Sequence, residues 1–419
     1  MAHYGHVMGP RILLATTVIW PSAARLACAF SDSGARVEAV FPSGHMMGKS
    51  RYLSAARGYA PLLPRRSFAN ALSKAAPDLV VPCDDRAVGL LREVASHAPA
   101  LRPVIERSLG CAEVYADLMD RSVFIQTART MGIRAPETTS IADENALAAA
   151  LQHLGFPTVL KADRSAGGEG VFLVHDLESA TRAFRKLSAS GSRLRNLARV
   201  FKRRDAHFLH DAIRAPEVGI SAQRFVPGTP ATTSFACWKG KVLAAIHMDV
   251  LETVMPFGPA SVMRRAGCAD MEYAAHRIAE RFNLSGLHGL DFVRDADGRA
   301  HLIEINPRAT PASTLALGAG RDLAAALVAC IAPGVSTVRP VLTDNPVIAL
   351  FPQEWRRNPQ SEWIKSAYLD TPWDDPAVLR ACLEPTEMAP QRPAEKVQKD
   401  TSSPVQGQAL LTVHQAVGR

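Results

Sequence analysis

The chain has 419 residues, of which 47% are hydrophobic and 21% are charged. This length predicts two or three domains and argues against a single-motif binding module, and the composition excludes a largely disordered chain. The 48 Lys and Arg residues outnumber the 40 Asp and Glu residues, for a formal net charge of +8. That excess suits anionic small molecules, but it is spread over a long chain and does not favour nucleic acid as a partner.

The cysteines and the apolar runs bear on the compartment. The seven cysteines lie far apart and none forms a Cys-x-x-Cys pair, which favours a reducing, cytoplasmic location over a disulfide framework or a zinc site. No apolar run reaches the roughly 18 residues of a membrane-spanning helix, so no membrane partner is expected. Residues 11–28 have the form of a short signal peptide, but the βα rhythm that follows them favours a first strand and helix.

The N-terminal region, residues 1–110, alternates apolar runs with helix-like stretches. Strands are expected at residues 12–16, 37–41 and 79–82. This alternation predicts a small parallel α/β domain, although no Gly-x-Gly-x-x-Gly turn accompanies it.

Residues 43–50 offer an alternative phosphate site. They follow a predicted strand and end in Gly-Lys-Ser, and Asp84 and Asp85 end a later strand where a magnesium-binding acid of such a site would stand. However, Ser43 occupies the position where a phosphate-binding loop needs its first glycine. The spacing therefore favours an ordinary loop.

In the next region, residues 111–335, runs of strands and helices segregate, which predicts an α+β fold. Helices are expected over residues 120–131 and 143–154, the second behind an N-capping Asp143. A third helix, near residue 270, carries apolar residues at helical spacing that predict a core face: Met271, Ala274, Ala275, Ile278 and Phe282.

A glycine-rich turn joins two strand-like runs at residues 157–174. Lys161 lies in the first run, and Gly167, Gly168 and Gly170 occupy the turn. Glycines let backbone N–H groups approach phosphate oxygens and the lysine adds a point charge, so this segment is a candidate polyphosphate site. Taken alone, the pattern fits an ordinary β-hairpin equally well.

A second candidate site lies at residues 286–308, where an Asp-Gly turn joins two strand-like runs. Strand side chains alternate between faces, so Leu302, Glu304 and Asn306 are expected on one face of the return strand. Asp291 on the paired strand can join them. Carboxylate and amide oxygens are the ligands that Mg²⁺ prefers, so this hairpin is a candidate site for Mg²⁺ bound to nucleotide phosphates.

In this order, the segments resemble the ATP-grasp superfamily, which includes carboxylate-amine ligases, carbamoyl-phosphate synthetase and biotin carboxylase. The resemblance implies a parallel α/β domain at residues 1–110, which precedes a two-lobed ATP-grasp domain with antiparallel sheets at residues 111–335. The small lobe would span about 135–225. Residues 336–385 would form a C-terminal segment, and residues 386–419, without an aromatic residue, are expected to be a disordered tail.

The resemblance also implies nucleotide contacts. Lys161 would touch the α- and β-phosphates of ATP, and the turn with Gly167, Gly168 and Gly170 would close over the phosphates. The remaining contacts would come from one residue before the small lobe and from a hinge strand at residues 221–228: Arg121, Gln223, Arg224, Phe225 and Val226.

The metal and the reacting groups are implied in the same way. Asp291, Glu304 and Asn306 would hold Mg²⁺, for which Mn²⁺ is a substitute. Arg308 would face an acyl phosphate or the acceptor anion. Arg264 lies where some relatives have a phosphate-binding arginine, with a basic strand end as the alternative.

Three positions depart from the family pattern. Arg121 stands where many relatives have a lysine, and Gln223 stands where a hinge acid is common, but both retain hydrogen-bonding groups. Ala231 stands where relatives often have a carboxylate for the ribose hydroxyls, which leaves the sugar contacts open.

Two further segments have no assigned role. A basic insertion at residues 188–216 fits either a helix over a ligand or a solvated surface, and the second is favoured. Residues 348–359 are expected to pack against the last strand rather than to line an acceptor pocket.

The expected function is an ATP-dependent, ADP-forming ligase, in which a substrate carboxylate becomes an acyl phosphate that an amine then attacks. The expected partners are small-molecule carboxylate and amine substrates, with a homodimer as one open arrangement. Two alternatives remain: an ATP-binding regulatory module without turnover, and a bicarbonate-using, carboxylase-like enzyme. The chain has no Met-Lys-Met segment for biotin attachment.

Overall fold

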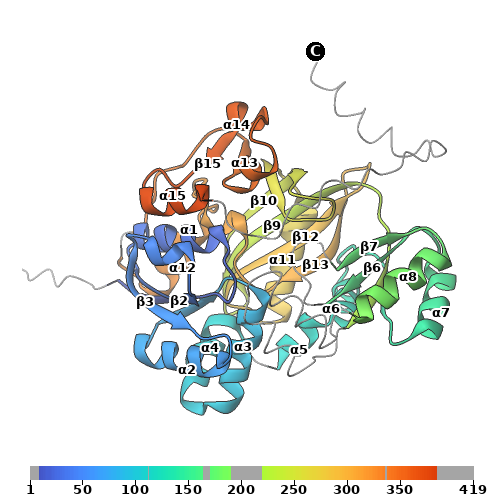
Figure 1. The fold of residues 1–419 in the computed structure, drawn as a ribbon, viewed down its shortest axis with the longest axis horizontal. Coiled ribbons are helices and arrows are strands. Elements are labelled where there is room, and N and C mark those ends of the chain that lie inside the picture. Colours follow the sequence, from blue (N-terminus) through green and yellow to red (C-terminus); the bar gives the residue numbers. More distant parts are fainter. Residues whose placement is uncertain (1–8, 112, 164–169, 190–218, 336, 385–419) are drawn as a thin grey trace, which may run out of the picture. The chain divides into compact units, whose positions relative to one another are not determined.

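The computed structural model describes residues 9–111, 113–163, 170–189, 219–335 and 337–384. Three sheets organise this part of the chain (Figure 1), and they confirm the predicted order of a parallel α/β region followed by antiparallel sheets with helices. No helix in these ranges is long and apolar enough to cross a membrane. The predicted tail, and the insertion beyond Ala189 as far as residue 216, lie outside the described residues.

The first sheet is parallel, with the strand order β3-β2-β1-β4. Its strands are β1 (Arg11–Ala15), β2 (Arg36–Pro42), β3 (Leu53–Tyr59) and β4 (Leu79–Pro82). The helices of this region are α1 (Pro21–Asp32), η1 (Met46–Lys49), α2 (Pro64–Ala75), α3 (Asp85–His97), η2 (Pro99–Leu101) and α4 (Arg102–Leu109). The three predicted strands are confirmed, and the stretch that has the form of a signal peptide is instead β1 and the first part of α1.

Strand β3 is missing from the prediction. Its sequence, Leu-Ser-Ala-Ala-Arg-Gly-Tyr, contains no β-branched residue and so has little strand propensity. It forms because it pairs with β2 along the edge of the sheet, where alternate residues remain exposed.

The second sheet has seven strands in the order β13-β12-β9-β10-β11-β14-β15. They are β9 (Thr229–Trp238), β10 (Lys241–Thr253), β11 (Ala260–Arg265), β12 (Gly286–Arg294), β13 (Ala300–Asn306), β14 (Val347–Leu350) and β15 (Tyr368–Asp370). All neighbours are antiparallel except β14 and β15. Because β14 and β15 come from the C-terminal segment, that segment completes the sheet.

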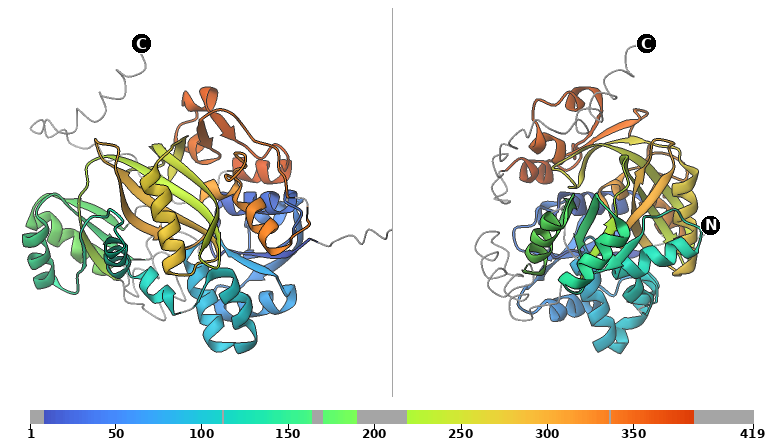
Figure 2. Two further views of the ribbon diagram at one scale, coloured as in Figure 1. Left: turned by 180° about the vertical axis from the view of Figure 1, so that it is seen from behind. Right: turned by 90° about the vertical axis from the view of Figure 1, so that its right-hand side faces the viewer.

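Helix α11 (Ala269–Arg281) lies across one face of the seven-stranded sheet (Figure 2). The predicted core stripe is confirmed, since Met271, Ala274, Ala275, Ile278 and Phe282 are all buried. The other helices around this sheet are α5 (Val114–Met119), α6 (Arg121–Thr130), η4 (Pro311–Thr314), α12 (Leu323–Ile331), α13 (Gln353–Arg357) and α14 (Trp363–Ser366). The last described helix, α15 (Pro376–Leu383), packs against η1.

The third sheet has the order β5-β8-β6-β7 and its own small core. Its strands are β5 (Thr138–Ser140), β6 (Thr158–Ala162), β7 (Val171–Val174) and β8 (Ile220–Arg224), and α7 (Glu144–Leu154) and α8 (Leu177–Ser188) pack against it. Asp143 caps α7 as predicted, because its carboxylate accepts a hydrogen bond from Ala146 N at 2.8 Å. Asp120 caps α6 in the same way.

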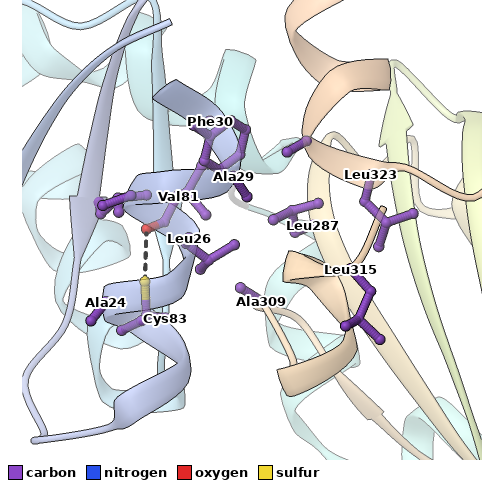
Figure 3. Packing of buried hydrophobic residues seen from close by; sticks show 14 of the residues in the cluster. Ala24, Leu26, Ala29, Phe30, Val81, Cys83, Leu287, Ala309, Leu315 and Leu323 are labelled. Carbon is purple, nitrogen blue, oxygen red and sulfur yellow. Dashed lines mark hydrogen bonds between the residues drawn. The ribbon is translucent and has the colours of Figure 1, made fainter. Parts of the chain in front are cut away.

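One continuous core joins the parallel sheet to the seven-stranded sheet (Figure 3). Leu26 and Phe30 of α1 belong to the same buried cluster as Leu287 of β12 and Leu323 of α12. Ala309, just after β13, lies in this cluster and donates its backbone N–H to Pro82 O at the end of β4. The segment after β13 is therefore held against the carboxyl end of the parallel sheet.

The alternative phosphate loop at residues 43–50 forms a different structure. It ends in η1, a short 3-10 helix whose Met46 and Met47 are buried. Because no α-helix begins at η1, the loop lacks the α-helix N-terminus that binds phosphate in such sites. Lys49 contacts Glu384 at 3.5 Å, and the Ser50 hydroxyl donates to Asp375 at 2.6 Å. The loop is thus an attachment point for the C-terminal segment. Helix α13 packs elsewhere, against β11 and β14, as expected for residues 348–359, and its buried Glu354 accepts hydrogen bonds from Ser261 and Arg357.

Two histidines are buried among the residues that the structure describes. His288 on β12 and His45 before η1 are almost inaccessible, and burial lowers the pKa of each to about 4. In the unfolded chain each returns to about 6.5, so between these values the unfolded state binds more protons than the folded state. We therefore expect the free energy of unfolding to be retained above pH 6.5 and to fall as the pH drops to 4, by roughly 3 kcal/mol per histidine.

Urea unfolding of a His288→Asn protein at a series of pH values between about 7 and 4.5 isolates the share of one histidine. Its unfolding free energy should decline less steeply with acid than that of wild type, whatever its stability at neutral pH. His175, which is exposed, provides the control, and His175→Asn should keep the wild-type slope. A wild-type slope in the His288 variant would contradict the prediction.

Candidate functional site

The acidic pair of the site is set by the register of two strands. Asp291 on β12 lies opposite Glu304 on β13, and directly opposed residues of an antiparallel pair point to the same face. Phe292 lies opposite Leu302, so one residue of β13, Ile303, has no partner and forms a bulge.

This bulge corrects the expected alternation. Leu302 packs with Phe292 in the core under α11, whereas Glu304 and Asn306 lie on the other face with Asp291. Strict alternation would place Leu302 and Glu304 together. The extra residue reverses the face, and the predicted grouping of Asp291, Glu304 and Asn306 still forms.

Asn306 connects Asp291 to an arginine. Its Nδ2 donates to Asp291 Oδ2 at 2.8 Å, and its Oδ1 accepts from Arg308 Nη2 at 2.9 Å. Arg308 Nε also donates to Asp85 Oδ1 at 3.0 Å, at the start of α3. Although burial acts against its charge, Asp85 and neighbouring acids raise the pKa of Arg308, which therefore stays charged.

Lys161 approaches this group from the small sheet. It lies on β6, and only 5% of its surface is exposed. Burial lowers the pKa of Lys161 to about 8, with the nearby charge of Arg121 acting in the same direction and those of Glu304 and Asp291 opposing it. Lys161 is therefore electrostatically coupled to the carboxylates of the seven-stranded sheet, and it is mostly charged at neutral pH.

Arg121, at the start of α6, bridges the two sheets. Its Nη1 donates to Asp163 Oδ1 at 2.9 Å, just after β6, and its Nη2 donates to Glu304 Oε2 at 3.3 Å on β13. Its Nε is buried and has no hydrogen-bond partner among the described residues.

The two carboxylates respond differently to this setting. Burial and the charge of Glu304 raise the pKa of Asp291 to about 6, against hydrogen bonds from Thr232 and Asn306. Burial also acts to raise the pKa of Glu304, but Arg121, Lys161 and nearby cationic groups outweigh it and hold that pKa below its usual range. The site thus keeps one firmly ionised carboxylate beside one that ionises near neutral pH.

The hinge residues are only partly arranged as a nucleotide site. Gln223 on β8 is buried, and its amide donates to Thr138 Oγ1 at 2.9 Å and to Ile303 O at 3.3 Å, so it joins the two sheets. The backbone N–H of Arg224 donates to Glu137 O, and its guanidinium donates to Leu154 O at 2.8 Å.

Phe225 and Val226 follow β8 and are half-buried in the connection to β9. Gly228 ends this connection under tight packing, since a Cβ there would lie 2.1 Å from Arg294 O. The connection is thus closely packed against the end of β12.

Arg264 is not brought to the site. Cross-strand pairing places Arg264 of β11 in one row with three residues of the neighbouring strands: Asp249 of β10, Ala231 of β9 and Phe292 of β12. That row belongs to the α11 face of the sheet, whereas Asp291 belongs to the other face. Arg264 is exposed and contacts Asp249 Oδ2 at 3.5 Å. Its sequence position resembles that of a phosphate-binding arginine, but the strand register turns it away. Ala231 is buried on the same α11 face.

The glycine turn is described only in part. Gly167 and Gly168 lie outside the described residues, whereas Gly170 is buried at the start of the return path and accepts a hydrogen bond from Ala162 N at 2.9 Å. The two strands that flank the turn, β6 and β7, pair in antiparallel register as predicted.

Three residues that hold the site together were not predicted from the sequence. Asp163 holds Arg121, Asp85 holds Arg308, and Thr232 lies opposite Asp291 and hydrogen-bonds to it. Asp85 appears in the sequence only as part of the alternative phosphate site. All three contacts are tertiary, so spacing along the chain carries no signal of them, apart from the position of Asp163 two residues after Lys161.

The donor set fits the group that the sequence predicts. Two carboxylates and an amide side chain gather on one face of β12 and β13, and carboxylate and amide oxygens are the hard ligands that Mg²⁺ takes. In this structure the amide oxygen of Asn306 accepts from Arg308, and its nitrogen donates to Asp291. Three cationic side chains surround them: Lys161, Arg121 and Arg308. Such a site can neutralise a polyphosphate from two sides, with the metal on one side and the cations on the other.

Comparison with known proteins identifies a related family of domains. Residues 120–312 match the family described as the ATP-grasp domain. A stretch of 194 residues, 46% of this chain, is 26% identical to the carbamoyl phosphate synthase large chain of Gemmatimonas aurantiaca. The match spans only 16% of that much longer relative.

Solved structures share the fold at low identity. The biotin carboxylase domain of 2-oxoglutarate carboxylase from Hydrogenobacter thermophilus, in complex with MgADP, ADP and bicarbonate, aligns with a TM-score of 0.54 at 14% identity, covering 80% of this chain and 72% of that one. N5-carboxyaminoimidazole synthase from Aspergillus clavatus, in complex with ADP and 5-aminoimidazole ribonucleotide, aligns with a TM-score of 0.56 at 13% identity, covering 78% and 79%. Residues 120–312 thus match the ATP-grasp domain in sequence, and the fold of the chain agrees with that of these structures.

Proposed function

We propose that this chain is an ATP-dependent, ADP-forming ligase that joins a carboxylate to an amine. The observation that carries the proposal is the meeting of Lys161 and Arg121 with Glu304 between the two sheets of the ATP-grasp domain, beside Asp291 and Asn306. This arrangement provides positive charge and metal-type oxygen ligands at one place, which phosphoryl transfer requires.

In the proposed site, ATP lies between the two sheets. Lys161 and Arg121 bind its phosphates. Phe225 and Val226 line the adenine side, next to Gln223 and Arg224. Asp291, Glu304 and Asn306 hold Mg²⁺, or Mn²⁺ in its place, and the bound ion neutralises charge on the phosphates.

The proposed reaction has two steps. First, an oxygen of the substrate carboxylate bonds to the γ-phosphorus, and the bond between that phosphorus and the β–γ bridging oxygen breaks to release ADP. Second, the amine nitrogen bonds to the acyl carbon, phosphate leaves, and the amine loses one proton. Arg308 lies beside Asn306, where its guanidinium can hold the anionic acyl phosphate, and no nucleophilic side chain is needed.

The test is the release of ADP in the presence of panels of carboxylates and amines. A ligase should release ADP at a high rate only when one carboxylate and one amine are supplied together. Release that depends on bicarbonate would favour the carboxylase-like alternative. Tight MgATP binding without ADP release in any mixture would favour the regulatory module.

A further inference from the structure

Arg121 has a bond that conflicts with the metal-binding role of its partner. Its guanidinium contacts Glu304 Oε2 at 3.3 Å, and Glu304 is the carboxylate of the proposed metal site that stays most firmly ionised. A divalent cation at Glu304 would lie close to the positive charge of Arg121. Arg121 and a metal ion therefore compete for the carboxylate of Glu304.

Arg121 also has a hydrogen-bond donor that an anion could accept from. Its Nε is buried without a hydrogen-bond partner among the described residues, and its side chain is only 13% exposed. A buried guanidinium N–H that lacks an acceptor is costly, so an incoming oxyanion would relieve it. Asp163 holds the Nη1 end at 2.9 Å, so the group can change its other partner without leaving the site.

We propose that Arg121 makes cation binding depend on the nucleotide: it acts as the counter-ion of Glu304 and exchanges this carboxylate for a phosphate when ATP enters. This inference rests on the proposed function. In the exchange, Glu304 turns from the guanidinium to the cation, and Arg121 turns from the carboxylate to the phosphate, so that each charge keeps a partner.

Asp163 is the positioning residue of this exchange. It lies directly after β6, at the base of the segment that leads into the glycine turn, and keeps Arg121 next to both the phosphates and Glu304. Without Arg121 the cluster of Asp163, Asp291 and Glu304 would have one positive charge fewer, and free divalent cations should bind to it more tightly.

The experiment measures two affinities in the full-length chain. Free Mn²⁺ binding is followed by the loss of the aqueous Mn²⁺ electron paramagnetic resonance signal, and MgATP binding is followed by calorimetry. In Arg121→Gln, we expect affinity for Mn²⁺ alone to rise by about tenfold or more and affinity for MgATP to fall by a similar factor. Most single changes to a metal site lower both affinities, so opposite shifts are diagnostic.

Three further variants sharpen the test. Arg121→Lys keeps the charge, so its affinity for Mn²⁺ alone should stay at the wild-type level. Arg121→Gln combined with Glu304→Gln should lose the gain in Mn²⁺ affinity, which assigns it to this carboxylate. Arg25→Gln is the matched control, because Arg25 is also 13% exposed and pairs with Asp370 at 2.7 Å away from the site; both of its affinities should match wild type.

The outcomes separate this inference from the function on which it rests. Reduced MgATP affinity in Arg121→Gln with unchanged Mn²⁺ affinity would overturn the exchange and leave the ligase proposal intact. Failure of the wild-type chain to bind MgATP at all would overturn the ligase proposal, and the exchange with it.

Discussion

Replacing Glu304 by Gln should reduce ADP release by about a hundredfold or more while leaving the fold intact. Gln keeps the size of the side chain and can still bind Arg121, but it removes the negative charge that would hold the metal opposite Asp291. The measurement is the rate of ADP release with a productive carboxylate and amine pair, over a range of Mg²⁺ concentrations. A metal role predicts that a high Mg²⁺ concentration partly restores the rate.

The matched control is Glu252→Gln. Glu252 is exposed to a similar degree and also contacts an arginine at 3.3 Å, but that arginine is Arg357 of α13. Its turnover should remain within about twofold of wild type, because surface ion pairs contribute little. If Glu304→Gln turns over at the wild-type rate, Glu304 does not belong to the catalytic site.

Local patterns in the sequence predict several elements of this fold and part of its site. The hairpin of β12 and β13 follows from two apolar runs and an Asp-Gly turn, and the carboxylate and amide at Glu304 and Asn306 stand out because polar residues on a buried strand need partners. The helix α11 follows from its apolar stripe. Each of these signals is local, since a strand or helix alternates its faces within a few residues.

The wrong predictions concern which face of a strand a residue occupies, and local sequence patterns do not determine this where strands bulge or shift register. The bulge at Ile303 reverses which neighbours share the face of Glu304, and a run of strand-forming residues looks the same with or without it. Arg264 and Arg265 are adjacent basic residues on one strand, and only the register with β10 shows that Arg264 faces α11. A shift of one residue exchanges the two faces.

The partners of the cationic residues are tertiary. Arg121 meets an acid from β13 that is far away in the sequence, and Arg308 meets Asp85 from the parallel sheet. Sequence spacing can show that charged residues exist near strand ends, but not which of them form pairs. The loop at residues 43–50 illustrates the reverse error, since a motif-like string with Lys49 at its end folds into an attachment for the C-terminal segment.

Lys161→Ala should weaken MgATP binding by roughly a hundredfold, whereas Lys49→Ala should leave it unchanged. Lys161 is buried between the sheets, where a charge-assisted contact to phosphate contributes about 2 to 3 kcal/mol. Lys49 is about half exposed and contacts only Glu384 in the described part of the chain. Calorimetry near pH 7 is the suitable measurement, because burial sets the pKa of Lys161 at about 8 and the group is mostly charged there.

This pair of variants discriminates between the two candidate phosphate sites, at Lys161 and at residues 43–50, before any substrate is known. Loss of affinity in Lys49→Ala alone would mean that residues 43–50 hold the phosphates, and the proposed ligase site would then be wrong. A Lys161→Arg protein adds a test of charge, because arginine remains protonated at alkaline pH. If Lys161 acts through its charge, wild-type affinity should decline as the pH rises through about 8, and that decline should be absent in Lys161→Arg.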